Sequence, residues 1–179
     1  MSNFDRAFEY TVGNEGGYTN DAADAGGPTY WGITQADYSR FLGRHASVQD
    51  VKNMPIDDAK KIYEAHYWKS LSLDQISCDE VAMCMFDIGV VRGIGVPPKY
   101  AQQICNHHGS HLTLDGHIGP LTLFAINACD PGAFIRDFSS LAEGGFRAIV
   151  AARPSQGVFL KGWVRRARRL LTLIPKSAA

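Results

Sequence analysis

The residues best suited to chemistry lie near the N-terminus, in the stretch NEGGYTNDAADAGGPT (14–29). Glu15 follows an apolar stripe of helical spacing and precedes Gly16-Gly17. A carboxyl group at the edge of an apolar face is partly desolvated, and a helix C-terminus also disfavours negative charge. Both effects raise a carboxyl pKa, as a general acid working near neutral pH requires. Glu15 is therefore the first candidate catalytic residue.

Two further polar side chains make the stretch suitable for breaking a glycosidic bond. Asp24 lies in a turn-rich segment exposed to water, so it should stay ionised. Thr29 follows five residues later, and its hydroxyl can hold a water molecule. Glycoside hydrolysis needs a neutral acid, a carboxylate and a positioned water. On residue types alone, a helix-end glutamate followed by turn-forming aspartates is an equally good interpretation.

The elements that must position these residues are mostly helical. A helix is expected over residues 4–15, with Asn3 or Asp5 as its cap and Gly16-Gly17 as its end. Short strands are expected around 18–19 and 31–33, beside the turns. Further helices are predicted at 35–42, 55–68, 79–91, 99–106, 120–128, 132–152 and from 159 onwards. The pattern predicts a mainly α fold with a small β-turn element near the N-terminus.

Composition limits the class of protein. With 45% apolar residues, 179 positions can build one sizeable core, or a main lobe with a small appendage. No apolar run approaches the roughly 20 residues that span a bilayer, and MSNFDRAFEY is unlike a signal peptide. The four cysteines have no CxxC spacing, so free thiols in a reducing compartment are expected. The chain is therefore expected to fold in the cytoplasm in which it is made, without a signal peptide.

The net charge is zero but unevenly spread. Residues 1–98 hold 8 Lys/Arg and 14 Asp/Glu, whereas residues 99–179 hold 10 and 4. Basic residues concentrate in 161–169, on the last predicted helix. A docked amphipathic helix with a solvated basic rim is the simpler interpretation, and contact with a polyanion or a membrane surface is the functional one. No nucleic-acid motif accompanies the patch, so no nucleic acid is expected as a partner.

Other polar and aromatic residues have simpler interpretations. Asp87 lies inside the most apolar predicted helix, where a structural hydrogen bond is favoured over catalysis. Tyr63 and Tyr67 are spaced i, i+4, and core packing is favoured over sugar stacking. His66 is interpreted as structural. The Cys and His residues between 105 and 117 fit no zinc pattern, and acid catalysis needs no metal, so no cofactor is expected.

Five blocks of sequence together resemble the glycoside hydrolase family 108 muramidases, lysozyme-like enzymes common in bacteriophages. They occur in the family's order and are EGGYTNDAADAGGPTYWGIT (15–34), AKKIYEAHYW (59–68), FDIGV (86–90), LDGHIGPLTLFAI (114–126) and FLKGWVRRARRL (159–170). The resemblance implies a lysozyme-like α+β fold with Glu15 as the catalytic acid. The last two blocks resemble the family's small peptidoglycan-binding region.

The resemblance also maps the partners of the acid. By order along the motif of phage-type lysozymes, they are Asp24 and Thr29, although their spacing is one residue shorter than that pattern, and Asp21 is the rival of Asp24. Tyr30-Trp31 stands where the family often has Asn-Tyr, and FDIGVVRG lacks the asparagine often found before its glycine. The residues predicted to bind substrate are Tyr18, Asp21, Tyr30 and Trp31.

The predicted function is that of a muramidase acting as a phage endolysin. It would cleave the β-1,4 bond between N-acetylmuramic acid and N-acetylglucosamine in peptidoglycan, as a monomer, in the periplasm after membrane permeabilisation. A lysozyme-like catalytic region is expected at 1–96. A helical peptidoglycan-binding-like lobe is expected at 97–179, packed against the first region and joined to it by the linker Gly93–Pro98. The alternatives are a lytic transglycosylase and a non-catalytic wall-binding module.

Overall fold

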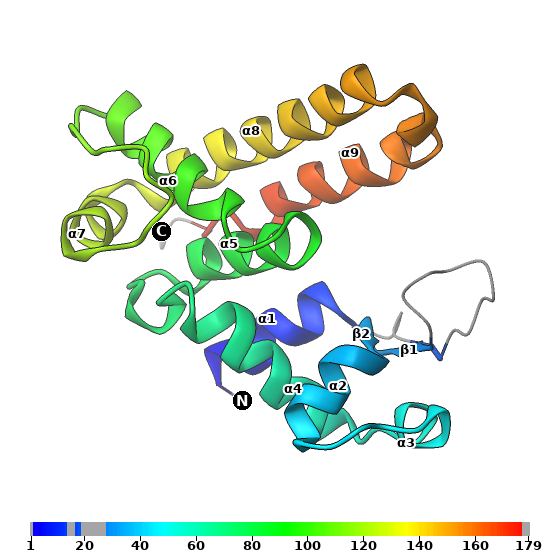
Figure 1. Cartoon of the computed structure of the whole chain (residues 1–179). Helices are drawn as coiled ribbons and strands as arrows, with labels where there is room; N and C mark the ends of the chain where they lie inside the picture. Colours follow the sequence, from blue (N-terminus) through cyan, green and yellow to red (C-terminus); the bar gives the residue numbers. More distant parts are fainter. Residues whose placement is uncertain (1, 14–16, 19–27, 177–179) are drawn as a thin grey trace. The chain divides into compact units, whose positions relative to one another are not determined.

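A computed structural model of the chain describes residues 2–13, 17–18 and 28–176 (Figure 1). The chain forms two compact units, residues 1–69 and 70–179. The described residues are mainly helical, with one small antiparallel sheet of two strands. The predicted fold class, mainly α with a small β element near the N-terminus, is therefore confirmed. The predicted division at residue 96 concerns the two family-like regions, and it stays a prediction.

The first unit consists of short helices and one hairpin. Its described elements are α1 (Asn3–Thr11), β1 (Thr29–Tyr30), β2 (Ile33–Thr34), α2 (Gln35–Leu42), α3 (Val48–Lys52), α4 (Ile56–Tyr63) and a π-helical continuation of α4, η1 (Glu64–Lys69). The predicted helix at 55–68 is therefore an α-helix whose last turns widen into a π-helix. Such widened turns occur frequently at functional sites.

Helix α1 begins and ends differently from the prediction. Its cap is Ser2, whose hydroxyl accepts a hydrogen bond from the backbone N–H of Asp5 (3.1 Å), while the Asp5 carboxylate accepts one from the Ser2 N–H (3.1 Å). The helix ends at Thr11, and Gly13 adopts a left-handed φ of +49°. The predicted continuation to Glu15 is thus wrong, because Gly13 breaks the helix before Gly16-Gly17. Glu15 itself lies outside the described residues.

Aromatic rings form the core of the first unit. Phe4 and Phe8 are buried on one face of α1, as their spacing predicts. Phe4 packs edge-on against Trp68 with ring centroids 5.9 Å apart, and Phe8 against Tyr63 at 5.5 Å. Tyr63 is only 5% exposed, which confirms the core interpretation of this residue, and Tyr67 stacks on it at 5.5 Å. These contacts tie α1 to α4 and to η1.

The second unit is helical throughout its regular elements. These are η2 (Leu73–Gln75), α5 (Asp79–Arg92), α6 (Val96–His107), α7 (Pro120–Ala128), α8 (Pro131–Ala152), η3 (Pro154–Phe159), α9 (Leu160–Arg169) and η4 (Leu170–Leu173). The predicted linker Gly93–Pro98 is wrong in its second half, because α6 already begins at Val96. Pro97 and Pro98 occupy its first turn, where their missing N–H groups cost no hydrogen bond.

Asp87 lies in the most deeply buried part of α5 and is 1% exposed. Arg166 of α9 donates two parallel hydrogen bonds to its carboxylate, Nε to Oδ2 at 2.9 Å and Nη2 to Oδ1 at 2.7 Å. A buried carboxylate needs such a partner. The prediction of a structural role for Asp87 is thus confirmed, and the ion pair joins α5 to α9.

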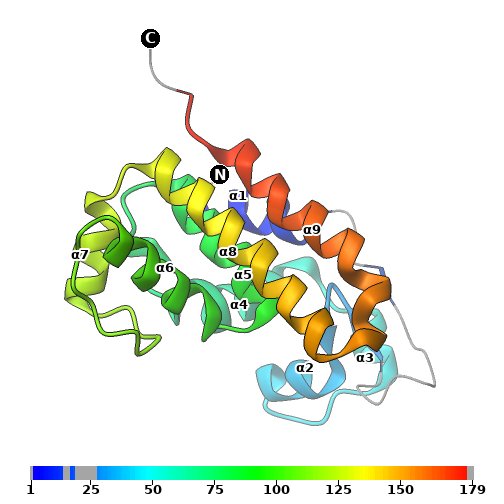
Figure 2. The same cartoon turned by 90° about the horizontal axis from the view of Figure 1, so that it is seen from above.

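Helices α8 and α9 run side by side (Figure 2). Phe146 stacks on Trp163 at 5.3 Å, and the Ser139 hydroxyl donates to the Ala167 carbonyl at 2.9 Å. Glu143 accepts hydrogen bonds from Arg147 and Arg168, which lower its pKa to about 2. Two of the α9 arginines, Arg166 and Arg168, are thus bound within the fold, as the docked-helix interpretation requires.

Candidate functional site

The residues predicted to act on substrate divide into two groups. Glu15, Asp21 and Asp24 lie outside the described residues. Thr29, Tyr30, Trp31 and Tyr18 are described, and all of them belong to the first unit. Thr29 is half-buried in β1, directly opposite Thr34 of β2.

The hairpin turn places Trp31 in an unusual backbone conformation. Strands β1 and β2 are joined by Trp31 and Gly32, whose φ angles are +53° and +74°. Two-residue hairpins favour turns in which both central residues have positive φ, because such turns match the twist of the strands. A positive φ is nevertheless strained for a bulky residue such as Trp31. The prediction of a strand through Trp31 was therefore wrong, because the strands end on either side of it.

Tyr63 holds this turn in place. Its hydroxyl donates a hydrogen bond to the Trp31 carbonyl at 3.0 Å. A Cβ atom on Gly32 would lie 2.7 Å from the same hydroxyl oxygen, so only glycine fits there. The core tyrosine of α4 thus fixes the position of the hairpin and, through it, of the Trp31 ring.

Three predicted substrate-binding residues form one aromatic platform, made of Tyr18, Tyr30 and Trp31. The Tyr30 and Trp31 rings stack with centroids 5.0 Å apart and an interplanar angle of 28°. Tyr18 meets Tyr30 edge-on at 6.5 Å, and Lys52 Nζ lies 6.0 Å from the centre of the Tyr18 ring. Within the described ranges, the buried indole Nε1 of Trp31 has no hydrogen-bond partner. The described part of the chain therefore leaves this buried N–H without an acceptor.

A cavity of about 310 Å³ adjoins the Trp31 side of the platform. Its lining residues are Phe8, Glu9, Gly13, Trp31, Ile56 and Lys60. Sequence reasoning missed Glu9 and Lys60, because both read as solvated residues on the polar faces of their helices. Lys60 also pairs with Asp5 at 2.9 Å, which raises the pKa of Lys60 and lowers that of Asp5 to about 2. The cavity therefore presents both an acidic and a basic group to a ligand.

A second, smaller hollow of about 100 Å³ adjoins Gly32 of the hairpin turn. It is lined by Gly32, Ile33, Asp37, Arg40, Ile62, Tyr63, His66 and Tyr67. Burial raises the pKa of the Tyr67 hydroxyl. His66, interpreted from sequence as structural, is exposed and belongs to this lining.

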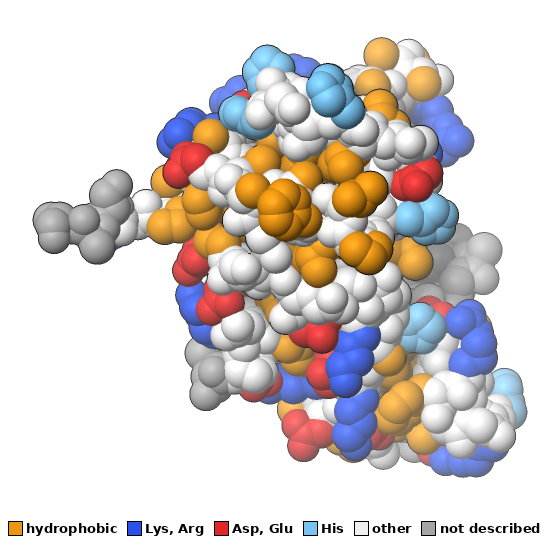
Figure 3. All heavy atoms as spheres, turned by 90° about the vertical axis from the view of Figure 1, so that its left-hand side faces the viewer, with side chains coloured by type: hydrophobic (Ala, Val, Ile, Leu, Met, Phe, Trp, Pro, Cys, Tyr) orange, Lys and Arg blue, Asp and Glu red, His pale blue; other side chains and the backbone are white. Residues whose placement is uncertain are grey.

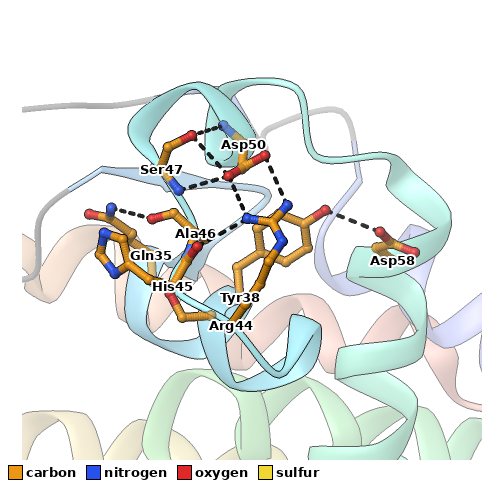
Figure 4. A network of polar contacts seen from close by, with 9 residues as sticks. Gln35, Tyr38, Arg44, His45, Ala46, Ser47, Asp50 and Asp58 are labelled. Atoms are coloured by element: carbon orange, nitrogen blue, oxygen red, sulfur yellow. Dashed lines mark hydrogen bonds and ion pairs between the residues drawn. The ribbon is translucent and has the colours of Figure 1, made fainter.

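A polar network fixes α3, the helix that carries Lys52 (Figure 4). Arg44 donates to both oxygens of Asp50, at 3.0 and 3.2 Å, and holds the pKa of that carboxyl well below its ordinary value. Asp50 in turn accepts the backbone N–H of Ser47 at 2.8 Å and closes the cap of α3. Tyr38 of α2 donates to Asp58 of α4 at 3.1 Å. The network makes the α2–α4 segment a rigid support for the hairpin.

In the second unit, the motif DGHIGPLT (115–122) is held by one buried amide. Gln102 is 1% exposed, and its Nε2 donates to Asp115 Oδ1 at 2.7 Å and to the His117 carbonyl at 2.9 Å. Its Oε1 accepts the N–H of Gly116 at 3.0 Å. The first of these contacts is the main cause of the lowered pKa of Asp115. A buried, fully bonded amide gives this loop a single defined conformation.

In the part of the chain that the structure describes, no three His, Cys, Asp or Glu side chains are grouped so that they could hold a metal ion. No described helix has the length and apolar character needed to cross a membrane.

Comparison with known proteins assigns both parts of the chain. Residues 8–93 match a family model described as glycosyl hydrolase 108, and residues 96–168 match one described as a predicted peptidoglycan domain. The structure of SagA from Brucella abortus is similar, with a TM-score of 0.75 and 27% sequence identity over 98% of each chain. No curated protein sequence matches. The chain is thus a peptidoglycan-degrading glycosyl hydrolase whose residues 8–93 belong to glycosyl hydrolase family 108.

Proposed function

We propose that the chain is an N-acetylmuramidase, a lysozyme that hydrolyses the β-1,4 bond between N-acetylmuramic acid and N-acetylglucosamine. The observation that carries this proposal is the cavity beside the aromatic platform. Gly13 lines that cavity, and Glu15 follows it by two residues in the sequence. The chain segment with the proposed acid thus leaves the described structure at the edge of a sugar-sized hollow.

Glu15 acts as the general acid. It donates its proton to the glycosidic oxygen while the bond from that oxygen to C1 of the muramic acid breaks. Asp24 stabilises the oxocarbenium-like transition state or helps to activate a water molecule, and Thr29 positions that water. The water oxygen bonds to C1, and its proton returns to a carboxylate, which leaves a reducing end on the muramic acid. Asp21 is the alternative to Asp24.

The aromatic platform supplies the substrate contacts in this mechanism. Stacked rings offer flat apolar faces to the C–H face of a pyranose ring, and the Trp31 N–H can donate to an acetamido carbonyl. Trp31 is thus a substrate-binding residue, and Tyr30 and Tyr18 support it. The charged groups of the cavity, Glu9 and Lys60, face the same ligand.

The test is digestion of purified Gram-negative peptidoglycan, with mass spectrometry of the soluble products. Wild-type protein should release fragments with reducing muramic acid ends, and Glu15→Gln should release none. Glu64→Gln is the matched control, because Glu64 is a glutamate of the same unit paired with Lys69 at 3.5 Å. Asp24→Asn and Asp21→Asn distinguish the two rival carboxylates.

Each other outcome overturns a defined part of the proposal. Anhydro ends, lighter by one water, would make the protein a lytic transglycosylase. Binding to peptidoglycan without any product would make it a wall-binding module. Loss of activity in Glu9→Gln with full activity in Glu15→Gln would transfer the role of the acid to Glu9, which lines the cavity.

We further propose the biological setting of a phage endolysin. The protein would be made in the host cytoplasm and act as a monomeric bacteriolytic enzyme on periplasmic peptidoglycan, once a separate protein has permeabilised the membrane. Expression in a Gram-negative host should leave the cells intact until the inner membrane is opened with chloroform, and then lyse them. Lysis without permeabilisation would contradict this setting. For contact of α9 with an anionic wall or outer-membrane surface, Arg166 and Arg168 are already engaged in ion pairs with Asp87 and Glu143.

A further inference from the structure

Helix α7 presents an apolar face to the surroundings of the second unit. Leu121 and Phe124, spaced i, i+3, are 77% and 76% exposed, while Thr122, Ala125 and Ile126 are buried on the opposite side. Figure 3 shows hydrophobic side chains gathered on the side of the molecule where α7 lies, with histidines along their border. Large side chains exposed together in this way mark a binding surface.

A cavity of about 270 Å³ opens next to this face. Its lining residues are His111, Leu112, Thr113, Asp115, His117, Gly119, Pro120, Leu121 and Thr122. Leu121 belongs to both the cavity and the apolar face, so the two form one surface. The loop that forms the cavity is the one fixed by Gln102, and it therefore exists before any ligand binds.

The charges of the cavity indicate an uncharged occupant. Among the residues that the structure describes, its lining contains no Lys or Arg, so these residues offer no permanent cation to the carboxylates of a stem peptide or to a lipid phosphate. Its one carboxylate, Asp115, is already bonded to Gln102 and to the N–H of His117. An apolar pair of side chains beside a polar hollow whose one described carboxylate is already hydrogen-bonded matches a sugar ring, which has one C–H face and an edge of hydroxyl and amide groups.

We propose that the α7 surface, defined as Leu121, Phe124 and the adjoining cavity, binds N-acetylhexosamine rings of the glycan strand. A ring stacks on Phe124 and Leu121, and its acetamido or hydroxyl groups enter the cavity. The inference takes its ligand from peptidoglycan, the polymer named by the proposed function, and it places the contact in the peptidoglycan domain at 96–168. The surface holds the wall while the first unit cuts it.

The test uses the full chain with Glu15→Gln added to prevent cleavage. Binding to insoluble peptidoglycan is measured by sedimentation, with and without soluble chitotetraose, an uncharged oligosaccharide, as competitor. The double variant Leu121→Ala/Phe124→Ala should bind about tenfold more weakly or worse. Each of its two substitutions removes an apolar side chain that a bound sugar would bury. The control is Ile94→Ala/Leu171→Ala, two exposed apolar residues of the same unit that lie outside residues 96–168, 46% and 41% exposed, which should bind like the parent.

Four results would overturn the inference. The first is an equal loss of binding in both double variants. The second is competition by free stem peptide instead of chitotetraose. The third is a concentration-dependent dimer that the Leu121→Ala/Phe124→Ala change abolishes, which would make the occupant a second copy. The fourth is binding of parent protein to anionic lipid vesicles that this same change removes.

Two outcomes distinguish a failure of the α7 surface from a failure of the proposed function. A wild-type protein that binds chitotetraose through the α7 surface but releases no fragments would refute the muramidase and leave the α7 surface intact. A protein that releases reducing ends, while Leu121→Ala/Phe124→Ala binds peptidoglycan as the parent does, would refute the α7 surface alone.

Discussion

The ion pair between Asp87 and Arg166 gives the sharpest prediction about stability. The Asp87 side chain is 1% exposed and that of Arg166 is 28% exposed, and two hydrogen bonds of 2.9 and 2.7 Å join them. Arg166→Met removes the partner and leaves an uncompensated carboxylate in the middle of α5. Loss of one partner from a buried pair costs about 3–5 kcal/mol. We therefore expect the free energy of unfolding of the second unit to fall by about that amount.

The pair between Arg168 and Glu143 supplies the matched control. It has similar geometry, with a contact of 2.7 Å, but the Arg168 side chain is 62% exposed and Glu143 keeps Arg147 as a second partner. Exposed pairs contribute about 0–1 kcal/mol, so Arg168→Met should be nearly neutral. Both changes remove one arginine from the same helix, so they differ mainly in the burial of the carboxylate left behind.

The assay is urea unfolding followed by circular dichroism, with hydrogen exchange of the α5 amides to assign the loss to the second unit. The double variant Asp87→Leu/Arg166→Met should be more stable than Arg166→Met alone, because no unpaired charge is then buried. The free energy of unfolding of Arg166→Met could instead lie within about 1 kcal/mol of the wild-type value, or fall no further than that of Arg168→Met. Either result would mean that burial of the Asp87 charge does not control the stability of this unit.

Two further predictions concern the first unit. Gly32→Ala should lower its free energy of unfolding by about 1–3 kcal/mol, because the new Cβ meets the Tyr63 hydroxyl at 2.7 Å in a left-handed conformation; a melting temperature equal to that of the wild type would contradict this. The pKa of Asp5 is lowered from 3.8 to about 2, chiefly by Lys60. The stabilisation from this pair is therefore fully present above pH 4 and lost as the pH falls towards 2. Asp5→Asn should flatten the acid limb of a stability–pH curve, and an unchanged limb would exclude the pair as its cause.

Local patterns in the sequence predict most of the helices, because a helix is specified by contacts within a few residues. The predicted bounds of 120–128 and 132–152 agree with α7 and α8 to within one residue. The predicted elements are wrong at positions where the φ angle of a single residue ends a helix or a strand. Gly13 ends α1 at Thr11, although the apolar stripe continues past it, and the aromatic Trp31, typical of a strand, takes a turn position instead.

Long-range partners are the part that sequence reasoning cannot supply. A buried Asp87 could be predicted to need a partner, but the partner lies 79 residues away on α9. The partners of Gln102 are likewise distant in the sequence. Its side chain organises the loop around Asp115 and His117, and nothing in the sequence around Gln102 indicates this role. At the candidate site, the motif located the platform residues, whereas Lys60 enters the cavity only because α4 packs beside α1.

Trp31 combines three features that each carry a free-energy cost. It has a left-handed φ of +53°, its buried Nε1 has no hydrogen-bond partner among the described residues, and its ring lines a cavity instead of a packed core. Such costs persist at functional sites, where the surrounding structure holds a residue in place for a ligand. Here Tyr63 provides that restraint through the Trp31 carbonyl.

The Trp31→Phe change is therefore expected to weaken substrate binding while it leaves the stability of the protein level or raises it. The change keeps an aromatic ring to stack on Tyr30 and removes only the N–H donor and part of the ring. If the donor serves the substrate, the free enzyme loses no hydrogen bond and its melting temperature stays level or rises. The KM for peptidoglycan fragments should then increase about 2- to 12-fold, the factor that a hydrogen bond of about 0.5–1.5 kcal/mol gives. A lower melting temperature with an unchanged KM would mean that the indole N–H serves the fold and does not donate to the substrate.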